Sequence, residues 1–490
     1  MIERLKEIDN IIKEGPFSDT FESLTQFEMP RWFEKAKFGI FIHWGLFSVP
    51  AYNNEWYSRN MYVKDSDEYN HHISTFGPHT EFGYKDFIPM FKAEKFNASE
   101  WVNIFKEAGA KYIVPVAEHH DGFQMYKSDI SHFNAFEMGP HKDIIGELKN
   151  AANKENITFA TSTHRAEHFW FMGCGREFES DITGELNRGD FYWPSVAEQP
   201  DQQDFKANPY PTQEFLDDWL IRTCEIIDKY QPAILYFDWW VAHEGYQPTF
   251  MKIAAYYYNM GKKWNKEVAI AYKHDALPFG SGIVDVERGK FADAKPYHWQ
   301  TDTAIAHNSW CYTTNLMYKT SYEIITYMVD VVAKNGNLLL NVGPKSDGTF
   351  AKEDADILKD IGSWLKVNGE AIYGSKPWRF AEEGPTKEVE GQFAEGGDGG
   401  YTSKDFRFTS NNGCIYAICM KCPDDGHFAI TRLARQENKD KPNYYGFVSK
   451  IEILGYNEEI SFTRDKEALK FSVPNLKSDM PVVIKIHTQP

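Results

Sequence analysis

The sequence predicts an α/β protein: a (β/α)8-like, TIM-type barrel followed by a C-terminal β-sandwich. Two observations predict this fold. Between about residue 37 and about residue 370, short apolar runs alternate with amphipathic stretches of helical period, which is the pattern of a parallel sheet. After Gly374 the pattern changes to polar, glycine-rich and alternating segments. We therefore expect a barrel domain over residues 1–374 and a β domain over residues 375–490.

The predicted barrel contains short strands and longer helices. Strand-like runs cover residues 38–43, 112–117, 158–161, 233–237, 268–272 and 338–342, with a further run at 283–288. Helices are expected at 101–110, 214–230, 250–259, 322–334 and 355–367. A chain of 490 residues is long enough for such a barrel and a second, smaller domain. Fewer than eight clear strand–helix pairs can be counted, which leaves room for an irregular barrel.

The C-terminal region has the character of a β domain. A glycine-rich stretch, Glu390–Gly400, is followed by an alternating pattern at Cys414–Cys419 and by further runs at 428–430, 448–454 and 482–486. Short strands of this kind predict a small β-sandwich. Cys419 and Cys422 have CxxC spacing, but no second ligand pair follows, so we favour ordinary strand positions over a zinc site.

Composition argues against several classes of partner. The chain has 53 Lys and Arg against 71 Asp and Glu, a net charge of −18. Nucleic acids and anionic membranes attract basic surfaces, so we expect neither as a partner. A neutral small molecule is the natural ligand of such a protein. Aromatic residues make up 16% of the chain; most can be core, but the excess also fits the flat walls of a sugar site.

The sequence also suggests a compartment. The first residues are charged and contain no apolar segment of a signal peptide, and no run of about 18 apolar residues occurs. The six cysteines are too sparse for a disulfide framework. A reduced cytoplasmic protein is the simplest expectation, although a secreted or periplasmic chain with its signal peptide removed would look the same. A homo-oligomer is compatible with the sequence.

Chemistry-bearing residues stand at the ends of the predicted strands, where barrel enzymes carry their active sites. Glycoside hydrolysis needs two carboxyl groups flanking the bond, about 5–5.5 Å apart in retaining enzymes. Asp238 follows four apolar strand residues and precedes Trp239, so it is the favoured nucleophile. Glu287 and Asp285 are candidates for the general acid, and Glu287 is favoured because it lies nearer the strand end.

Each of these residues also has a structural interpretation. Asp238 could be a helix N-cap, and Glu287 could be the ion-pair partner of Arg288 or Lys290. His119 and His120, with Asp121, could ligate a metal. Neighbouring strand residues point to opposite faces, however, so hydrogen bonds to sugar hydroxyls are favoured over metal or structural roles. We expect no metal and no organic cofactor.

Further motifs run through the whole barrel in order. They are WF at 32–33, KFGIFIHWG at 37–45, SVPA at 48–51, EWY at 55–57, FKEAGAKY at 105–112, HHDGF at 119–123, GP and KD at 139–143, NGNLLLNVGP at 335–344 and GSKPW at 374–378. In this number and order they resemble the α-L-fucosidases of glycoside hydrolase family 29.

The resemblance implies a retaining exo-glycosidase that releases terminal α-L-fucosyl residues from oligosaccharides or glycoconjugates by double displacement. A fucosylated oligosaccharide would be its substrate, and a C-terminal β-sandwich is usual in the family. Asp238 matches the family's nucleophile. The family's sugar-binding positions are matched by His43, Glu55, Trp56, His119 and His120.

The chain departs from the family at several positions. Many members have Trp-Glu where this chain has Trp299-Gln300, and an amide cannot donate a proton reversibly. Either that position is not catalytic and Glu287 is the acid/base, or the enzyme is impaired. Where many members have Tyr-Tyr-Ser, we expect His164 to contact the sugar, and Lys273 stands where many have an Arg near fucose. The expected aromatic walls against the apolar sugar face are Trp56, Trp239 and Trp310.

Three other functions stay open at this point. One is a catalytically weakened, sugar-binding relative, which Gln300 suggests. Another is an exo-glycosidase for a related sugar, such as a galactoside. The third is a metal-dependent hydrolase, which would lose its activity in a chelator.

Overall fold

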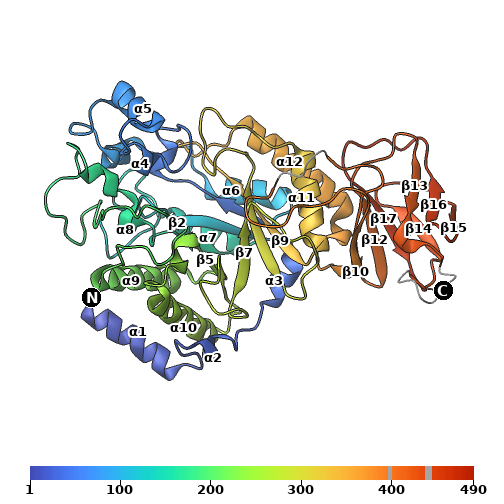
Figure 1. Ribbon diagram of the computed structural model, residues 1–490, viewed down its shortest axis with the longest axis horizontal. Helices are drawn as coiled ribbons and strands as arrows, with labels where there is room; N and C mark the ends of the chain where they lie inside the picture. Colours follow the sequence, from blue (N-terminus) through green and yellow to red (C-terminus); the bar gives the residue numbers. More distant parts are fainter. Residues whose placement is uncertain (396–399, 436–443, 490) are drawn as a thin grey trace.

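Eight parallel strands form a closed barrel, as predicted. The computed structural model describes residues 1–395, 400–435 and 444–489 (Figure 1). The barrel strands are β1 (Phe38–Ile42), β2 (Tyr112–Glu118), β4 (Thr161–Thr163), β5 (Ile234–Phe237), β6 (Ala269–Tyr272), β7 (Ile283–Glu287), β8 (Trp299–Ala304) and β9 (Gly336–Val342). β1 pairs in parallel with both β2 and β9, which closes the ring. A two-residue strand, β3 (Thr158–Phe159), also pairs with β2 just before β4.

Helices cover most of the outside of the barrel. Those that connect or follow its strands are α6 (Ala98–Glu107), α7 (Ile144–Glu155), α9 (Gln213–Tyr230), α10 (Gln247–Trp264), α11 (Ser321–Ala333) and α12 (Lys352–Asn368). α9, for example, begins where the Thr212 side chain accepts a hydrogen bond from the Phe215 N–H, and it ends at Gln231 in the left-handed conformation. The connections from β6 to β7 and from β7 to β8 are described in full and contain no helix, so the barrel is irregular there.

Further helices lie in the N-terminal segment and in the long connections after β1 and β4. They are α1 (Ile2–Glu14), α2 (Phe21–Leu24), α3 (Arg31–Ala36), α4 (Tyr57–Asn60), α5 (Asp67–Phe76) and α8 (His168–Phe171). α1 packs against α9 and α10, and its Ile8 and Ile12 are buried. Among the helices of the described residues, none is long and apolar enough to cross a membrane.

The barrel interior changes from apolar to polar toward the carboxyl ends of its strands. Near the amino ends, Tyr112 belongs to an apolar cluster, and a Cβ at Gly39 would lie 2.4 Å from the Tyr112 ring, so only glycine fits there. Near the carboxyl ends, β7 and β8 bring Asp285 beside Gln300 and Glu287 beside Asp302. The polar half of the interior therefore lies where a barrel carries its chemistry.

The C-terminal domain consists of two antiparallel sheets around a separate apolar core, which confirms the predicted β-sandwich. The larger sheet has the order β10 (Lys376–Glu383), β11 (Phe406–Asn411), β12 (Cys414–Cys419), β17 (Val482–His487) and β14 (Lys450–Ile453). The smaller has the order β13 (His427–Ile430), β16 (Leu469–Ser472) and β15 (Phe462–Arg464). Cys419 is the last residue of β12, whereas Cys422 lies beyond that strand, so the prediction of strand positions holds for Cys419 only.

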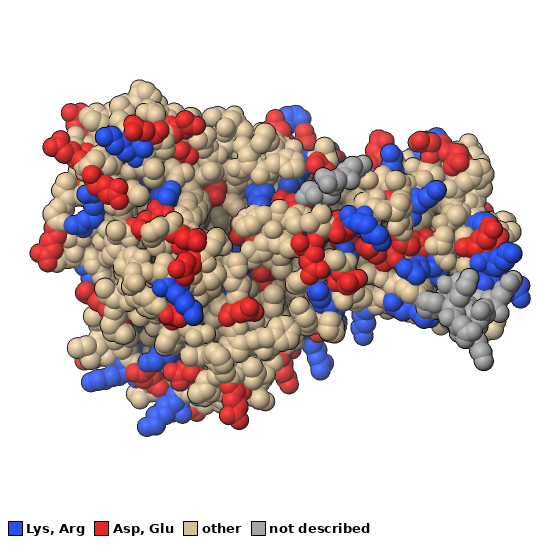
Figure 2. Space-filling model, in the orientation of Figure 1, with Lys and Arg blue, Asp and Glu red and all other residues tan. Residues whose placement is uncertain are grey.

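The two domains meet through buried charge as well as apolar surface. Strands β10 and β11 contact α11 (Figure 1). Asp330 of α11 accepts hydrogen bonds from Arg407 of β11 and from Lys334, the latter at 2.9 Å. Burial alone would raise the pKa of Asp330, but these two cations hold it well below its ordinary value. On the face shown in Figure 2, acidic side chains are scattered over both domains, with Lys and Arg interspersed.

Candidate active site

The predicted site residues surround one cavity of about 510 Å³ at the carboxyl ends of the barrel strands. Residues that line it include all eleven singled out in the sequence: His43, Glu55, Trp56, His119, His120, His164, Asp238, Trp239, Lys273, Glu287 and Trp310. They stand at or after the ends of seven barrel strands, from β1 to β8. The barrel thus brings side chains that are distant in sequence around a single space.

Asp238 follows the last residue of β5 and begins a short 3-10 helix, Trp239–Ala242. Its Oδ1 accepts hydrogen bonds from the Trp239 N–H (2.8 Å) and from Lys273 Nζ (3.2 Å). Its Oδ2 contacts His120 Nε2 (3.2 Å) and His164 Nδ1 (3.0 Å). Burial alone would raise the pKa of Asp238, but Lys273 and the two imidazoles outweigh burial and hold that pKa well below its ordinary value. Asp238 is therefore ionised, as a nucleophile must be. It is also the N-cap of this 3-10 helix, which confirms the structural interpretation, while its role as nucleophile stays a prediction.

Lys273 joins Asp238 to Glu287 across the cavity. Its Nζ donates to Glu287 Oε2 at 2.6 Å, and its side chain is only 3% exposed. Asp238 Oδ1 lies 3.2 Å and Glu287 Oε2 lies 2.6 Å from this Nζ, so the two oxygens cannot be farther apart than the sum of these distances. This upper limit is compatible with the roughly 5–5.5 Å between the carboxyl groups of retaining enzymes. Glu287 does not use the cations beside it in sequence, because Arg288 pairs with Glu395 and Lys290 with Glu388.

Glu287 has the proton affinity of a general acid at neutral pH. Burial raises the pKa of its carboxyl to about 7, the negative charges of Asp238 and Asp302 raise it, and Lys273 opposes them. A carboxyl with this pKa can hold a proton for a leaving group and later release it. The pKa of Asp238 is therefore lowered and the pKa of Glu287 is raised, although both carboxyls contact the same lysine. Glycoside hydrolysis needs one ionised and one protonated carboxyl, and this pair meets that requirement.

Asp302 is a third carboxyl at the cavity and was missed in the sequence. It lies beside Glu287 on β8, accepts a 2.7 Å hydrogen bond from Tyr236 Oη, and is 3.6 Å from Lys273 Nζ. β8 itself was missed because its four central residues, 300–303, are all polar, so the strand has neither an apolar run nor an apolar–polar alternation.

Asp285 and Gln300 form a buried layer beneath the cavity rather than part of its lining. Gln300 Nε2 donates to Asp285 Oδ2 at 2.8 Å, and Gln300 Oε1 accepts from Tyr112 Oη at 2.8 Å. Gln300 is thus a structural partner of neighbouring strands. The absence of a carboxyl at position 300 therefore gives no reason to consider the site impaired, and Glu287 is better placed than Asp285.

Four of the imidazoles that line the cavity form one contiguous cluster: those of His43, His119, His120 and His164. The ring centroids of His119 and His164, for example, are 4.9 Å apart. Burial lowers the pKa of His43 and of His119 well below the ordinary value, and nearby imidazoles lower both further. These two rings are therefore neutral at pH 7. His43 Nδ1 lies 2.6 Å from Asn341 Oδ1, so that nitrogen carries the proton and Nε2 is left as an acceptor for a hydroxyl.

The same histidines could be metal ligands by distance alone. Ring nitrogens of His43, His119 and His164 lie within 4.8 Å of one another, as do ligand atoms of His120, His164 and Asp238. Both nitrogens of His164 already have partners, however, because Nδ1 contacts Asp238 and Nε2 is 3.0 Å from Ser162 Oγ. A metal would have to break one of these hydrogen bonds. His164 is better suited to orienting Asp238 than to contacting the sugar.

Glu55 and the tryptophans build the walls. Glu55 Oε2 accepts from the Trp310 N–H at 3.0 Å, which ties the loop after β1 to the loop after β8. Trp310 lies beside His43, with ring centroids 5.3 Å apart, and Trp56 lies edge-on to His120 at 5.8 Å. The cavity wall thus contains both aromatic surfaces and hydrogen-bonding groups. A sugar ring needs both, because it has apolar C–H faces and polar hydroxyl groups.

Further lining residues were not singled out in the sequence: Phe41, Asn54, Arg59, Asn60, Gln202, Gln203, Tyr236, His274, Asp302, Gln392 and Phe393. Tyr236 stands two residues before Asp238 and so shares its side of β5, which is a usable signal. Gln392 and Phe393 belong to the glycine-rich stretch that follows β10 in the C-terminal domain. No pattern in that stretch predicts that it returns to the barrel.

Comparisons with known proteins agree with this geometry. A family model described as alpha-L-fucosidase matches residues 5–370, and one described as alpha-L-fucosidase C-terminal domain matches residues 400–486. The chain is 30% identical to the tissue alpha-L-fucosidase of Rattus norvegicus over 94% of this chain and 89% of that protein. It is 29% identical to the plasma alpha-L-fucosidase of Homo sapiens over the same shares. Among solved structures, the Thermotoga maritima alpha-fucosidase superimposes with a TM-score of 0.76 at 27% identity, covering 96% of this chain and all of that one.

Proposed function

Because the chain belongs to the α-L-fucosidase family, we propose that it hydrolyses terminal α-L-fucosyl residues of oligosaccharides by a retaining double displacement at this cavity. Family membership makes the chain a glycoside hydrolase. One observation carries the assignment of roles: a single lysine contacts both Asp238, whose pKa is held low, and Glu287, whose pKa is raised to about 7. Asp238 is the nucleophile and Glu287 is the general acid and base.

In the first step, an Asp238 carboxylate oxygen attacks the anomeric carbon of fucose while the bond to the leaving oxygen breaks. The Glu287 proton moves to that oxygen, so the leaving sugar departs as a neutral alcohol. In the second step, the Glu287 carboxylate takes a proton from water, and the water oxygen displaces Asp238 from the anomeric carbon. Two inversions return fucose in its original α configuration.

The charges in the site support the change of role at Glu287. The negative charge of Asp238 raises the pKa of Glu287 in the free enzyme. Forming the glycosyl ester removes that charge, so the pKa of Glu287 falls and the group becomes a base when a base is needed. Lys273 keeps Asp238 ionised beforehand and stabilises its carboxylate as it leaves.

Sugar recognition falls to neutral imidazoles, Glu55 and aromatic walls. The free nitrogen of His43 can accept from a hydroxyl, and Glu55 has an oxygen left for another. Trp310 and Trp56 present apolar surface to the C–H face and methyl group of the sugar. A solved relative, the Thermotoga maritima alpha-fucosidase in complex with fucose, is 27% identical with a TM-score of 0.73, which supports fucose as the ligand here.

The test compares aryl α-L-fucosides with aryl α-L-galactosides, which share the ring's hydroxyl pattern but carry a hydroxymethyl group at C5. We expect turnover of the fucoside to dominate, with α-L-fucose as the first anomer seen by NMR. Preference for the galactoside would point to a different exo-glycosidase. Binding of fucose without turnover of either substrate would indicate a silent relative.

A further inference from the structure

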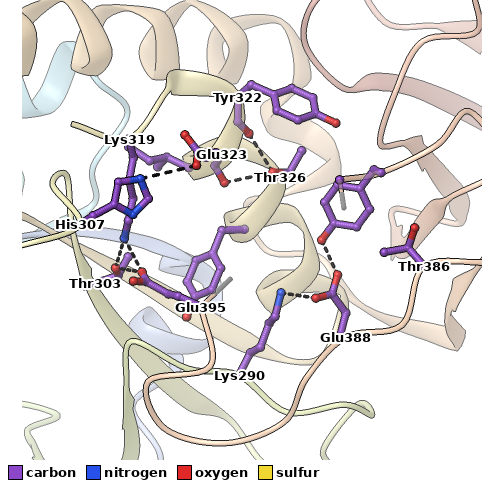
Figure 3. A pocket seen from close by; sticks show the side chains of 14 residues that line it. Lys290, Thr303, His307, Lys319, Tyr322, Glu323, Thr326, Thr386, Glu388 and Glu395 are labelled. Atoms are coloured by element: carbon purple, nitrogen blue, oxygen red, sulfur yellow. Dashed lines mark hydrogen bonds and ion pairs between the residues drawn. The ribbon is translucent and has the colours of Figure 1, made fainter. Parts of the chain in front are cut away.

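A segment that follows the first strand of the C-terminal domain crosses back to the active site. We call residues 386–395 the strap. At one end, Glu388 pairs with Lys290 (Figure 3) and, at 2.9 Å, with Arg407 of β11, and all three side chains are at most 3% exposed. Burial of Glu388 together with these two cations fixes this end, because a buried charge that lost its partner would be costly.

The other end of the strap is fixed to the barrel. Glu395 accepts hydrogen bonds from Thr303 of β8 and from Lys319 (Figure 3). It also accepts one from Arg288 at 3.3 Å, whose guanidinium stands over the Trp310 ring at 4.6 Å. The second anchor therefore rests on β8, on the connection after β8 and on the residue that follows Glu287 in sequence.

Between its anchors the strap runs along the end of β7. Gly391 and Lys290 exchange backbone hydrogen bonds, with the Gly391 N–H to Lys290 O distance at 3.0 Å. The Phe393 N–H donates to the carbonyl oxygen of Glu287 at 3.0 Å. Gln392 and Phe393 consequently line the cavity directly beside Glu287, and Phe393 is 66% exposed.

The position of a residue beside Glu287 determines which part of the substrate it can meet. The general acid donates its proton to the oxygen between fucose and the next unit, so that oxygen lies at Glu287 and the next unit extends from its side. An exposed aromatic ring there offers a flat apolar surface to the C–H face of a pyranose. A neighbouring amide can donate to and accept from its hydroxyls.

We propose that Phe393 and Gln392 form the subsite for the pyranose to which fucose is attached. The proposal rests on the function proposed above. It adds which residues would make the enzyme prefer a sugar as the leaving group. Its ligand class is the second sugar of a fucosylated oligosaccharide, with Phe393 as the stacking surface and Gln392 as the hydrogen-bonding group.

The experiment compares two substrates that differ only in what leaves. α-L-Fucosyl fluoride has no second sugar, whereas a fucosylated disaccharide has one. We expect Phe393→Ala to lower kcat/KM for the disaccharide by about tenfold and to leave kcat/KM for the fluoride within about twofold. Gln392→Ala should show the same selectivity. Phe279→Ala is the matched control, because Phe279 is also an exposed phenylalanine, at 62%, but does not line the cavity.

Phe393→Trp separates the subsite from a general effect on the fold, because it keeps a flat aromatic face and should retain most of the disaccharide activity. Equal loss with both substrates, or unchanged disaccharide activity in Phe393→Ala, would overturn the proposal. If the unaltered enzyme fails to hydrolyse fucosyl fluoride, the proposed function itself is wrong. The two failures are therefore distinguishable.

Discussion

The raised pKa of Glu287 predicts the pH dependence of the enzyme. Glu287 must be protonated to assist the leaving group, and its pKa is raised to about 7. Activity is then present below this pKa and lost as the pH rises through it. Above pH 7 the protonated fraction falls about tenfold per pH unit, so kcat/KM for a fucosyl oligosaccharide at pH 9 should be about one hundredth of its plateau. Asp238 stays ionised throughout, because its pKa is held well below the ordinary value.

Two substitutions test whether Glu287 causes this loss of activity above pH 7, which is the alkaline limb of the pH profile. Glu287→Gln cannot titrate, so its residual activity should lose the limb and fall by about 10²- to 10⁴-fold with oligosaccharides. Activated aryl fucosides, which need little protonation, should be much less affected. Lys273→Met removes the cation 2.6 Å from Glu287 Oε2, so the limb should move to higher pH. The measurement is kcat/KM from pH 5 to 9 for both substrate types.

Azide provides an independent readout. In Glu287→Ala, azide should attack the glycosyl-enzyme from the side that the base served, giving α-fucosyl azide. The reasoning would be refuted if both substrate types slowed equally, with lower thermal stability and no azide product. It would also be refuted if the limb near pH 7 persisted in Glu287→Gln. Asp302 would then be the group to test, because it lines the cavity whereas Asp285 does not.

Three further predictions follow from the site. Asp238→Ala should lose several orders of magnitude in turnover and yield β-fucosyl azide on rescue; retention of more than about a tenth of the activity, a loss of under about 1.4 kcal/mol, would remove Asp238 from the mechanism. Gln300→Glu should lower the free energy of unfolding by about 1–3 kcal/mol, since the donor to Asp285 is lost, without raising kcat; a tenfold gain in denaturation-corrected activity would place position 300 in catalysis. Metal analysis should find no stoichiometric metal at His43 and His119, and activity should survive a chelator; zinc at one equivalent with chelator-sensitive activity would reverse this prediction.

The barrel could be predicted as far as its strands follow ordinary rules. β5 and β9 have apolar runs, and α9 and α11 are long, mostly buried helical segments, so both kinds of element were recognised close to their observed bounds. β8 escaped because its buried side chains are polar and bonded to one another across strands, which only the assembled barrel reveals. Strand–helix alternation also fails after β6 and β7, where no helix intervenes.

The site could be predicted because strand ends converge in a barrel. All eleven residues of the predicted site line the cavity, which follows from their common position at carboxyl ends, whereas the alternative acid Asp285 and Gln300 do not line it. Hydrogen-bond partners could not be predicted in this way. That Lys273 rather than Arg288 would pair with Glu287, and that Ser162 would occupy the second nitrogen of His164, depends on side-chain directions within the closed barrel.

The strap has a consequence for how this architecture can be recombined. Residues 386–395 follow the first strand of the C-terminal domain, yet Gln392 and Phe393 line the cavity of the barrel. Replacing the whole C-terminal domain by that of a relative would therefore also replace part of the active site. A chimera with its crossover at Gly374 would import foreign side chains into the catalytic centre together with the new domain. A crossover beyond Glu395 would keep the centre intact but must then preserve the pairing of Glu388 with Arg407. Sequence changes in this segment of the C-terminal domain would therefore also change the residues that contact the substrate.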